Sequence, residues 1–393
     1  MLVSVLNFVF NVVMARLLGP ALFSQAAAIV TLLMLLSCIS LSFQMVCAKF
    51  VARNETPGAK SAIYRRISRQ AWQWGIVVSL VLFAAQKPIA EYLRMPNSWV
   101  IGVLAVGMAF YNQLGVKRGN LQGWCEFGSL SWNYIVEAAS KLALAVVLVE
   151  LGYGVFGVVG ALSASILVAV LMPGPRQRVF HHEDPANCIP ASFGEGVQAI
   201  VFFIGQVVIN NIDIILVKHF FDSELAGLYA AVALVGRLLY FASWQVVSAM
   251  FPVSAAAGEQ TGKKRVLGVP LVIVSLMCLG FIVILGIFPG FVMHIVFGEG
   301  FHSAESLLSL YAVSTGLYAL AMVLITYEMS RKIANTGWLQ LLFSGAIVLA
   351  IYMYHSDLRQ VIMVQVWLKV LMLLLVSLPF LGSIGGFRWK EVA

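Results

Sequence analysis

The first fifty residues read MLVSVLNFVFNVVMARLLGPALFSQAAAIVTLLMLLSCISLSFQMVCAKF (residues 1–50), and this stretch decides the fold class. Two apolar runs, at about 2–17 and 22–48, are separated by a short turn that contains glycine and proline. A helix needs roughly 20 mostly apolar residues to cross the hydrocarbon core of a membrane, and Gly-Pro punctuates helices. The stretch therefore predicts two consecutive transmembrane helices. We interpret Met1–Val13 as part of the first span rather than a removable signal peptide, because it has no basic leader and no small-residue cleavage site.

The same pattern continues along the whole chain. Of the 393 residues, 61% are hydrophobic and 11% are charged, whereas soluble proteins are about 45–50% apolar and about 25% charged. This composition excludes a water-soluble globular protein and predicts an all-α polytopic membrane protein with no room for a soluble catalytic domain. Runs of spanning length predict about twelve helices, at about 2–17, 22–48, 71–89, 98–116, 129–150, 152–173, 196–217, 224–252, 267–297, 303–326, 337–354 and 360–384.

The apolar runs fall into two sets of six on either side of a polar stretch, and the two sets resemble each other. Aligning the two halves places Asn7 opposite Asn210, each in an apolar helix that leads through a short turn into an alanine-rich helix. Six spans is an even number, so both copies have the same orientation, and the substrate site is expected between them. The predicted organisation is an N-terminal six-helix lobe at 1–175, a cytoplasmic interlobe linker at 176–194 and a C-terminal six-helix lobe at 195–393.

The positive charges predict the orientation of the chain in the membrane. The formal net charge is +8, and most of the 25 lysines and arginines fall in alternate loops. Because cytoplasmic loops carry the excess of Lys and Arg, the N- and C-termini are expected in the cytoplasm. The basic residues are spread over several short segments and form no single basic face, which argues against a nucleic-acid partner.

Enzyme signatures are absent from the sequence. It contains no Gly-x-Ser-x-Gly, His-Glu-x-x-His, P-loop or dinucleotide fingerprint, and its five cysteines form no Cys-x-x-Cys pair that would indicate a disulfide framework or a zinc site. The cluster His181–Asp184 lies in a proline-flanked polar stretch and is interpreted as part of a solvated linker. We therefore predict no catalytic residue, no metal and no cofactor.

Charged residues inside the predicted spans are the strongest functional signal, because each costs about 2.5–3.5 kcal/mol on insertion scales. Glu137 and Lys141 lie four residues apart and can meet on one helix face, either as a self-neutralising pair or as functional groups. Arg237 and Lys369 have no acidic neighbour within a turn or two of their own helices. The candidate partners of Arg237 are Asp213, a backbone carbonyl or a ligand anion.

Amides at membrane depth form a second group of candidates. Such side chains either join helices by hydrogen bonds or line a cavity for hydroxylated substrates, and joining helices is the expected role for most of them. They are Asn7, Asn11, Asn112, Gln113, Asn133, Gln206, Asn210, Asn211 and Gln245.

Three segments resemble a known family. The first, ARLLGPALF at Ala15–Phe23, is similar to the first-loop signature of bacterial polysaccharide transporters. The second, Arg118–Ser165, contains Arg-Gly, Leu-Gln-Gly, a Lys-Leu and a closing Gly-Val-x-Gly. The third, Gly205–Ala242, has the Ile-Asp, Ala-Gly-x-Tyr-Ala and Gly-Arg-Leu positions seen in flippases and multidrug exporters. The chain thus resembles the Wzx-type oligosaccharide flippases of the multidrug/oligosaccharidyl-lipid/polysaccharide (MOP) exporter superfamily.

The resemblance implies two six-helix lobes around a central cavity that opens alternately to either side of the bacterial inner membrane. It implies a non-enzymatic flippase of undecaprenyl-pyrophosphate-linked oligosaccharide for O-antigen, capsule or exopolysaccharide biosynthesis. The partners implied are the lipid-linked oligosaccharide, the lipid bilayer, a glycan polymerase and a chain-length regulator. A cationic cavity suits a pyrophosphate.

The candidate site residues follow from both lines of reasoning. Arg16 and Arg237 match positions at which members of the superfamily place cavity-facing arginines, and Asp213 matches an acidic position in the seventh helix. The other candidates rest on the residues alone. The predicted substrate-binding residues are Arg16, Arg237, Lys141, Lys369, Asn7 and Asn210, and the predicted ion-coupling residues are Asp213 and Glu137.

Three alternatives stay open from the sequence. A cation-coupled multidrug antiporter of the same superfamily would favour acids and aromatic residues over the bases found here. A peptidoglycan-precursor flippase usually has two further helices, for which this chain has no room. A membrane glycan polymerase or ligase usually needs a large outer loop, whereas the longest hydrophilic stretch, Pro173–Ser192, is predicted to be cytoplasmic.

Overall fold

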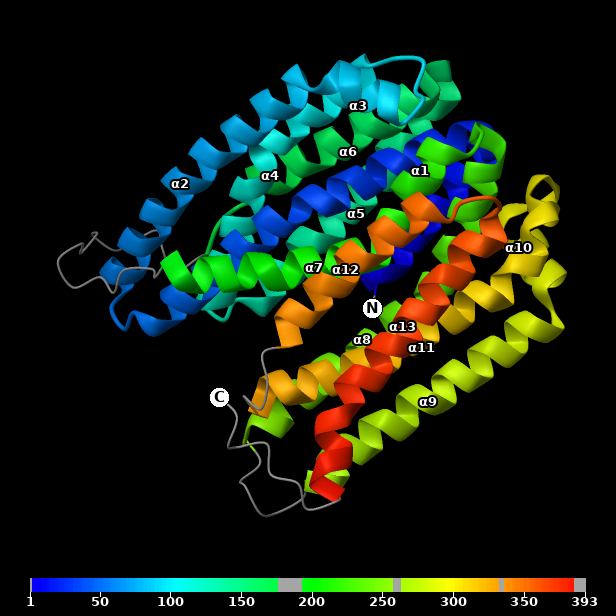
Figure 1. The fold of residues 1–393 in the computed structure, drawn as a ribbon. Coiled ribbons are helices and arrows are strands. Elements are labelled where there is room, and N and C mark those ends of the chain that lie inside the picture. Colours follow the sequence, from blue (N-terminus) through cyan, green and yellow to red (C-terminus); the bar gives the residue numbers. More distant parts are fainter. Residues whose placement is uncertain (1, 176–192, 257–262, 332–335, 385–393) are drawn as a thin grey trace. The chain divides into compact units, whose positions relative to one another are not determined.

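The computed structural model of the protein describes residues 2–175, 193–256, 263–331 and 336–384 (Figure 1). The described residues are helical nearly throughout and contain no strand, with a π-helical turn at Val149–Tyr153 and a 3-10 turn at Glu299–Ala304. The helices are α1 (Leu2–Arg53), α2 (Pro57–Ala84), α3 (Gln86–Tyr92), α4 (Trp99–Gly123), α5 (Phe127–Leu148), α6 (Gly154–Leu171), α7 (Phe193–Phe220), α8 (Ser223–Ala256), α9 (Lys263–Ile287), α10 (Pro289–Phe297), α11 (Glu305–Arg331), α12 (Thr336–Met353) and α13 (Leu358–Ile384).

Among the described residues, eight helical segments are long and apolar enough to cross a membrane. The number is nine if α2 and α3, which meet at 60°, form one broken span. The prediction of an all-α polytopic membrane protein is therefore confirmed. One of the eight, α1, has 52 residues, which corresponds to about 78 Å at 1.5 Å per residue and far exceeds a hydrocarbon core of roughly 30 Å.

Helix α1 is kinked at the short sequence that separates its two apolar runs. Gly19 adopts a φ of 69° and is followed by Pro20, so two helices meet there with a kink. Glycine adopts this positive φ without the steric cost that a Cβ imposes. The segment Phe127–Leu171 is broken in the same way, at Gly152 with a φ of 89°.

The described residues pack as two units, which comprise Met1–Gly227 and Leu228–Ala393. The first unit contains α1 to α7 and the first turn of α8, and the second contains the rest of α8 with α9 to α13. The predicted lobes at 1–175 and 195–393 stay a prediction, and the linker between them lies almost entirely outside the described residues.

In the first unit, α4 packs closely against α1 through a row of glycines. A Cβ on Gly115 would lie 2.4 Å from the carbonyl oxygen of Ser40, and a Cβ on Gly119 would lie 2.3 Å from that of Gln44. Small residues four apart let membrane helices approach until their backbones touch. The glycine of the Arg-Gly sequence that carries the family resemblance is thus a packing residue.

An apolar core surrounds this contact. Buried side chains of α1, α3, α4, α6 and α7 form one cluster, in which Ile29, Ile101, Leu104, Met108 and Val159 are fully covered. In the second unit, α8, α9 and α11 contribute a separate cluster around Leu239, Val274, Ala319 and Val323. Each unit therefore has its own core.

Candidate functional site

Polar side chains of α1, α4 and α5 meet inside the first unit at the depth of its apolar helices. The group consists of Asn7 from α1, Arg118 from α4, and Asn133, Glu137 and Lys141 from α5. We call these five residues the N-terminal polar cluster. Asn133, Glu137 and Lys141 are each four residues apart, so the helical repeat places them along one face of α5.

Arg118 is the centre of this cluster. Its guanidinium forms an ion pair with the Glu137 carboxylate, and the two side chains are only 7% and 19% exposed. Its Nε donates a hydrogen bond to Asn133 Oδ1 at 2.9 Å. The guanidinium also lies 3.8 Å from the centre of the Tyr134 ring. Arg118 is therefore held by charge, amide and ring together, as an arginine's planar group allows.

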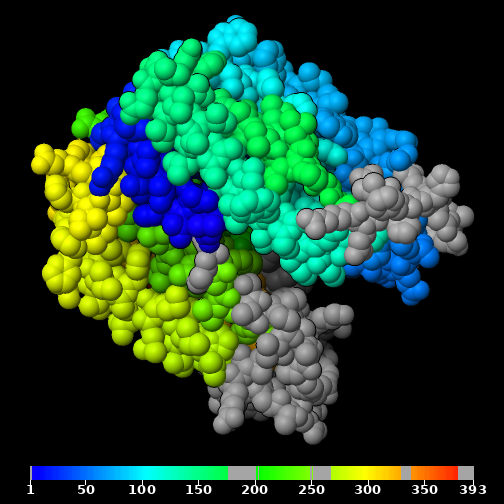
Figure 2. Space-filling view, turned by 180° about the vertical axis from the view of Figure 1, so that it is seen from behind, coloured from blue at the N-terminus to red at the C-terminus, as the bar shows by residue number. Residues whose placement is uncertain are grey.

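Lys141 lies beside this ion pair and has neutral partners. Its Nζ donates to Asn7 Oδ1 and lies 4.8 Å from the centre of the Phe10 ring. Figure 2 shows the start of α1, in dark blue, against α5, in teal. Glu137 thus pairs with Arg118 on another helix rather than with Lys141 on its own. Because Arg118 and Glu137 neutralise each other, the cluster keeps one positive charge, on a side chain that is only half-buried.

Lys117, next to Arg118, fastens the end of α6. Its Nζ donates to the carbonyl oxygens of Val170, at 2.6 Å, and of Met172. Asn133 Nδ2 donates to the Ala169 carbonyl at 2.8 Å. A cation and an amide donor at a helix C-terminus satisfy carbonyl groups that have no partner within the helix. The polar cluster is thereby anchored to a fourth helix, α6.

The second unit holds a smaller group, formed by Tyr229, Ser314, Gln365 and Lys369, which we call the C-terminal polar cluster. Lys369 Nζ donates to Ser314 Oγ at 2.9 Å and to Gln365 Oε1 at 3.4 Å. Gln365 Nε2 donates to the Tyr229 hydroxyl at 2.9 Å. The Lys369 side chain is 4% exposed. Arg237, on α8 of the same unit, is also buried.

The remaining predicted site residues lie on α1 and α7. Arg16 is exposed, three residues before the kink at Gly19. Asn210 is half-buried and donates from Nδ2 to the Gln206 carbonyl of its own helix at 2.9 Å. Asp213 is 2% exposed and accepts from the Ile214 N–H at 3.0 Å. Of the eight predicted residues, the structure brings Asn7, Glu137 and Lys141 into one cluster.

The sequence analysis missed Arg118, Lys117 and Glu328. The first two lie just beyond the predicted span at 98–116, but both are part of α4 and are buried. The sequence does offer a signal for them. Gly115 and Gly119 lie four residues apart on either side of these charges, a spacing that indicates a helix packing face extending past them. Glu328 ends an apolar run and is 1% exposed, and neither carboxylate oxygen accepts a hydrogen bond from the residues that the structure describes.

Metal-binding groups are not found in the described ranges, where no set of three or more His, Cys, Asp or Glu side chains could hold an ion. The cluster His181–Asp184 lies outside those ranges.

Comparison with known proteins gives a family and a fold. A family model described as "Polysaccharide biosynthesis protein" matches residues 13–306. No curated protein matches the chain in sequence. A multidrug resistance MATE family transporter of the MOP superfamily, solved in an inward-facing conformation, is similar with a TM-score of 0.81 at 13% identity, over 99% of this chain and 96% of that one. An outward-facing structure of such a transporter gives a TM-score of 0.67 at 14% identity, over 99% and 95% of the two chains.

Proposed function

The chain belongs to the polysaccharide biosynthesis protein family and has the fold of MOP-superfamily transporters, and from this premise we propose that it flips undecaprenyl-pyrophosphate-linked oligosaccharide across the bacterial inner membrane by alternating access. In this proposal no covalent bond is made or broken, and the protein is not an enzyme. Both termini lie in the cytoplasm, and a glycan polymerase and a chain-length regulator act on the product.

The observation that carries this proposal is the net charge of +1 of the cluster that contains Lys141. The Lys141 side chain is half-buried, and its ammonium has a neutral amide and a ring as its bonding partners. An ammonium in a site of low dielectric attracts a pyrophosphate strongly, while amides such as Asn7 can accept and donate hydrogen bonds to sugar hydroxyls.

We propose the same role in headgroup binding for the other predicted substrate-binding residues of each unit. Arg16, Asn7 and Lys141 of the first unit would meet the headgroup, as would Arg237 and Lys369 of the second, with Asn210 on α7 as a further contact. In the cycle, the cytoplasm-facing cavity admits the glycan, the cations hold the phosphates, and rocking of the lobes carries the headgroup to the outer face.

We also retain twelve spans in two six-helix lobes. The breaks at Gly19 and Gly152 support this number, because each divides a segment too long for one span into two helices. Counting α2 with α3 as one span and including the shorter apolar helix Trp338–Met353 then gives about twelve, each near the required length.

The test is restoration of surface glycan in a strain that lacks its oligosaccharide flippase, at equal membrane abundance of each variant. The wild-type protein and Lys141→Arg should restore glycan, whereas Lys141→Ala and Arg237→Ala should reduce it at least tenfold. Purified protein in liposomes, with a fluorescent lipid-linked oligosaccharide, measures flipping directly and removes the dependence on the host's glycan. Wild-type rates of flipping in Lys141→Ala would contradict the cationic-site mechanism.

Ion coupling through Glu137 or Asp213 is part of the same proposal. Both carboxylates lie in apolar helices of the first unit, where the cost of a charge favours exchange of a proton or a cation. The Glu137→Gln/Asp213→Asn double variant should flip at a rate that no longer responds to an imposed proton or sodium gradient. An unchanged response to both gradients would remove these residues from coupling.

A multidrug exporter is the second candidate, because two solved structures similar to this chain carry that description. Its cavity would take lipophilic cations. Export of ethidium from cells by this protein, with no competition from lipid-linked oligosaccharide in liposomes, would favour this function over the flippase.

A further inference from the structure

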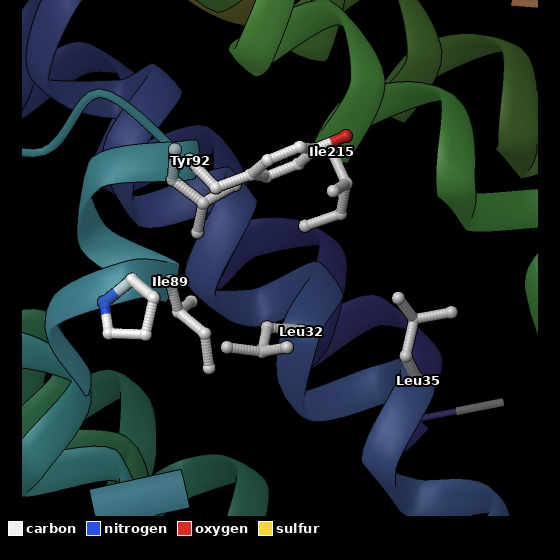
Figure 3. A pocket seen from close by; sticks show the side chains of 7 residues that line it. Leu32, Leu35, Ile89, Tyr92 and Ile215 are labelled. Carbon is white, nitrogen blue, oxygen red and sulfur yellow. The ribbon is translucent and has the colours of Figure 1, made fainter. Parts of the chain in front are cut away.

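A pocket of about 290 Å³ lies in the first unit between α1, α3 and α7 (Figure 3). None of its lining residues belongs to the N-terminal polar cluster. The wall is aliphatic apart from one tyrosine, and the side chains in Figure 3 enclose an apolar space. It is formed chiefly by Leu32, Leu35, Pro88, Ile89, Tyr92 and Ile215.

The pocket is lined in part by helices long and apolar enough to cross a membrane. Leu32 and Leu35 are in α1, and Ile215 is in the candidate span at Phe203–Phe220. Its volume is at the small end of the range for ligand pockets, which suits a segment of a hydrocarbon chain rather than a whole lipid. Branched aliphatic walls give a methyl-branched chain many close contacts, each of which adds a small dispersion attraction.

Tyr92, which lines the pocket, is held by two contacts with His219. The His219 ring stacks on the Tyr92 ring with 3.9 Å between the ring centres and 6° between the planes. His219 Nδ1 also lies 2.8 Å from the Tyr92 carbonyl oxygen. These two contacts tie α3 to α7, so the Tyr92 wall is fixed by side chains that take no part in lining the pocket.

Three basic residues lie close in sequence to the lining residues of this apolar space. Lys87 precedes the lining residue Pro88, Arg94 follows Tyr92 by two residues, and Lys218 follows Ile215 by three. Lys218 is buried and donates to Ser24 Oγ at 3.0 Å and to Ser223 Oγ at 2.7 Å.

Charged residues of both signs lie near this end of α3 and α7. Arg94 and Asp222 both act electrostatically on Lys218, and Glu91 is an exposed acid on α3. Lys218 is bonded to two serine hydroxyls, whereas Lys87 and Arg94 are exposed. We call Lys87 and Arg94, which lie next to the α3 wall in the sequence, the rim of the pocket.

We propose that this pocket binds the first isoprene units of the polyprenyl chain of the lipid-linked glycan, with the phosphate at Lys87 and Arg94 in the state that follows its release from the cavity cations. The assignment rests on the proposed function and adds a tail site to it. A polyprenyl lipid carries its phosphate on the first carbon of a methyl-branched chain, so charge and branched hydrocarbon are adjacent, as are the rim and the walls here. A glycerophospholipid separates its phosphate from its unbranched chains by glycerol and ester groups, so its charge and its hydrocarbon are not adjacent.

The test is photo-crosslinking of the full-length protein in lipid nanodiscs, with a polyprenyl diphosphate that bears a diazirine in its first isoprene unit. Labelled peptides of the wild-type protein should come from α1, α3 and α7. Leu35→Trp, which fills the pocket, should reduce labelling at least fivefold. The matched control Met34→Trp, at a neighbouring position of α1 that is 36% exposed and outside the pocket, should leave it within twofold.

A second pair of variants tests the rim. Lys87→Gln with Arg94→Gln should reduce labelling by the diphosphate several-fold and leave labelling by an uncharged polyprenol probe unchanged. Labelled peptides outside α1, α3 and α7 in the wild-type protein would overturn the proposal without any variant. Equal labelling of the pocket by a diazirine-bearing phosphatidic acid would assign it to an ordinary acyl chain and overturn the polyprenyl assignment.

The same preparations separate this proposal from the flippase function. Flipping by the wild-type protein without labelling of the pocket peptides would reject the tail site and keep the function. Labelling that Leu35→Trp abolishes, in a protein that flips no lipid-linked oligosaccharide, would keep the site and reject the function.

Discussion

Each unit contains one polar cluster, and each cluster contains a lysine that lies within an apolar helix. The two lysines differ in how far they are buried and in what they bond to. Lys141 is half-buried beside the Arg118–Glu137 ion pair, whereas Lys369 is 4% exposed and bonds to a hydroxyl and an amide. Both residues interrupt apolar helices and look alike in the sequence. The difference shows that how far packing covers a charge within a span is not visible in the sequence around that charge.

The largest effect on stability is expected from the removal of Glu137. Its removal in Glu137→Ala leaves the buried Arg118 without its counter-charge, which should lower the free energy of unfolding by about 3–5 kcal/mol. Thermal unfolding in detergent measures the loss. The control is the Arg118→Met/Glu137→Leu double variant, which removes both charges and should recover most of the stability. If the double variant is as unstable as the single one, the loss of stability comes from altered packing and not from the broken ion pair.

The two lysines can then be compared by one pair of substitutions. Lys141→Met should reduce flipping at least tenfold with little change in stability, because its charge and not its packing matters. Lys369→Met should reduce flipping and also cost about 1–3 kcal/mol, since Ser314 and Gln365 lose a buried hydrogen-bond partner. Liposome flipping and thermal unfolding of the same samples give both quantities. Equal loss of stability in the two variants would contradict the claim that Lys369 contributes more to stability than Lys141 does.

Close helix packing offers a third comparison between the units. A Cβ at Gly119 in the first unit would lie 2.3 Å from the backbone oxygen of Gln44, and a Cβ at Gly236 in the second would lie 2.3 Å from the Tyr311 ring. Overpacking costs about 1–3 kcal/mol, and a side chain yields more readily than a backbone. Gly119→Ala should therefore destabilise the protein more than Gly236→Ala, as measured by thermal unfolding, with Gly128→Ala as the unhindered control.

Membrane character and helix positions could be predicted from the sequence because few backbone structures are stable in hydrocarbon. A helix is one of them, since it satisfies its own backbone hydrogen bonds. Apolar runs bounded by Gly, Pro and charges mark the helices, and the kink between the first two runs falls at the Gly-Pro of the first-loop signature. Lys117 and Arg118 were misplaced for the same reason. A charge usually ends a span, but here Lys117 bonds to carbonyls at the end of α6 and Arg118 pairs with Glu137, so α4 continues to Gly123.

The site was predicted less completely because its partners come from distant parts of the chain. Helical spacing indicated that Glu137 and Lys141 share a face of α5. It could not show that Asn7 would reach Lys141, or that Arg118 would reach Glu137. Those contacts depend on how α1 and α4 pack against α5, and one sequence does not contain the crossing geometry.

The smallest effects are expected at the helix caps, one in each unit. At the start of α2, Thr56 Oγ1 accepts from the Ala59 N–H at 3.2 Å. At the start of α13, Asp357 Oδ1 accepts from the Gln360 N–H at 2.5 Å, and Gln360 Oε1 accepts in return from the Ser356 N–H at 2.7 Å.

Loss of a capping acceptor typically costs about 1 kcal/mol. Thr56→Ala removes the side-chain bond that caps α2 and should cost about that amount in thermal unfolding. Asp357→Ala should cost about half as much, because the Gln360–Ser356 bond still holds the first turn of α13. The Asp357→Ala/Gln360→Ala double variant removes both bonds and should match Thr56→Ala. If Asp357→Ala alone already costs as much as the double variant, the returning bond from Gln360 contributes nothing to the cap of the second unit.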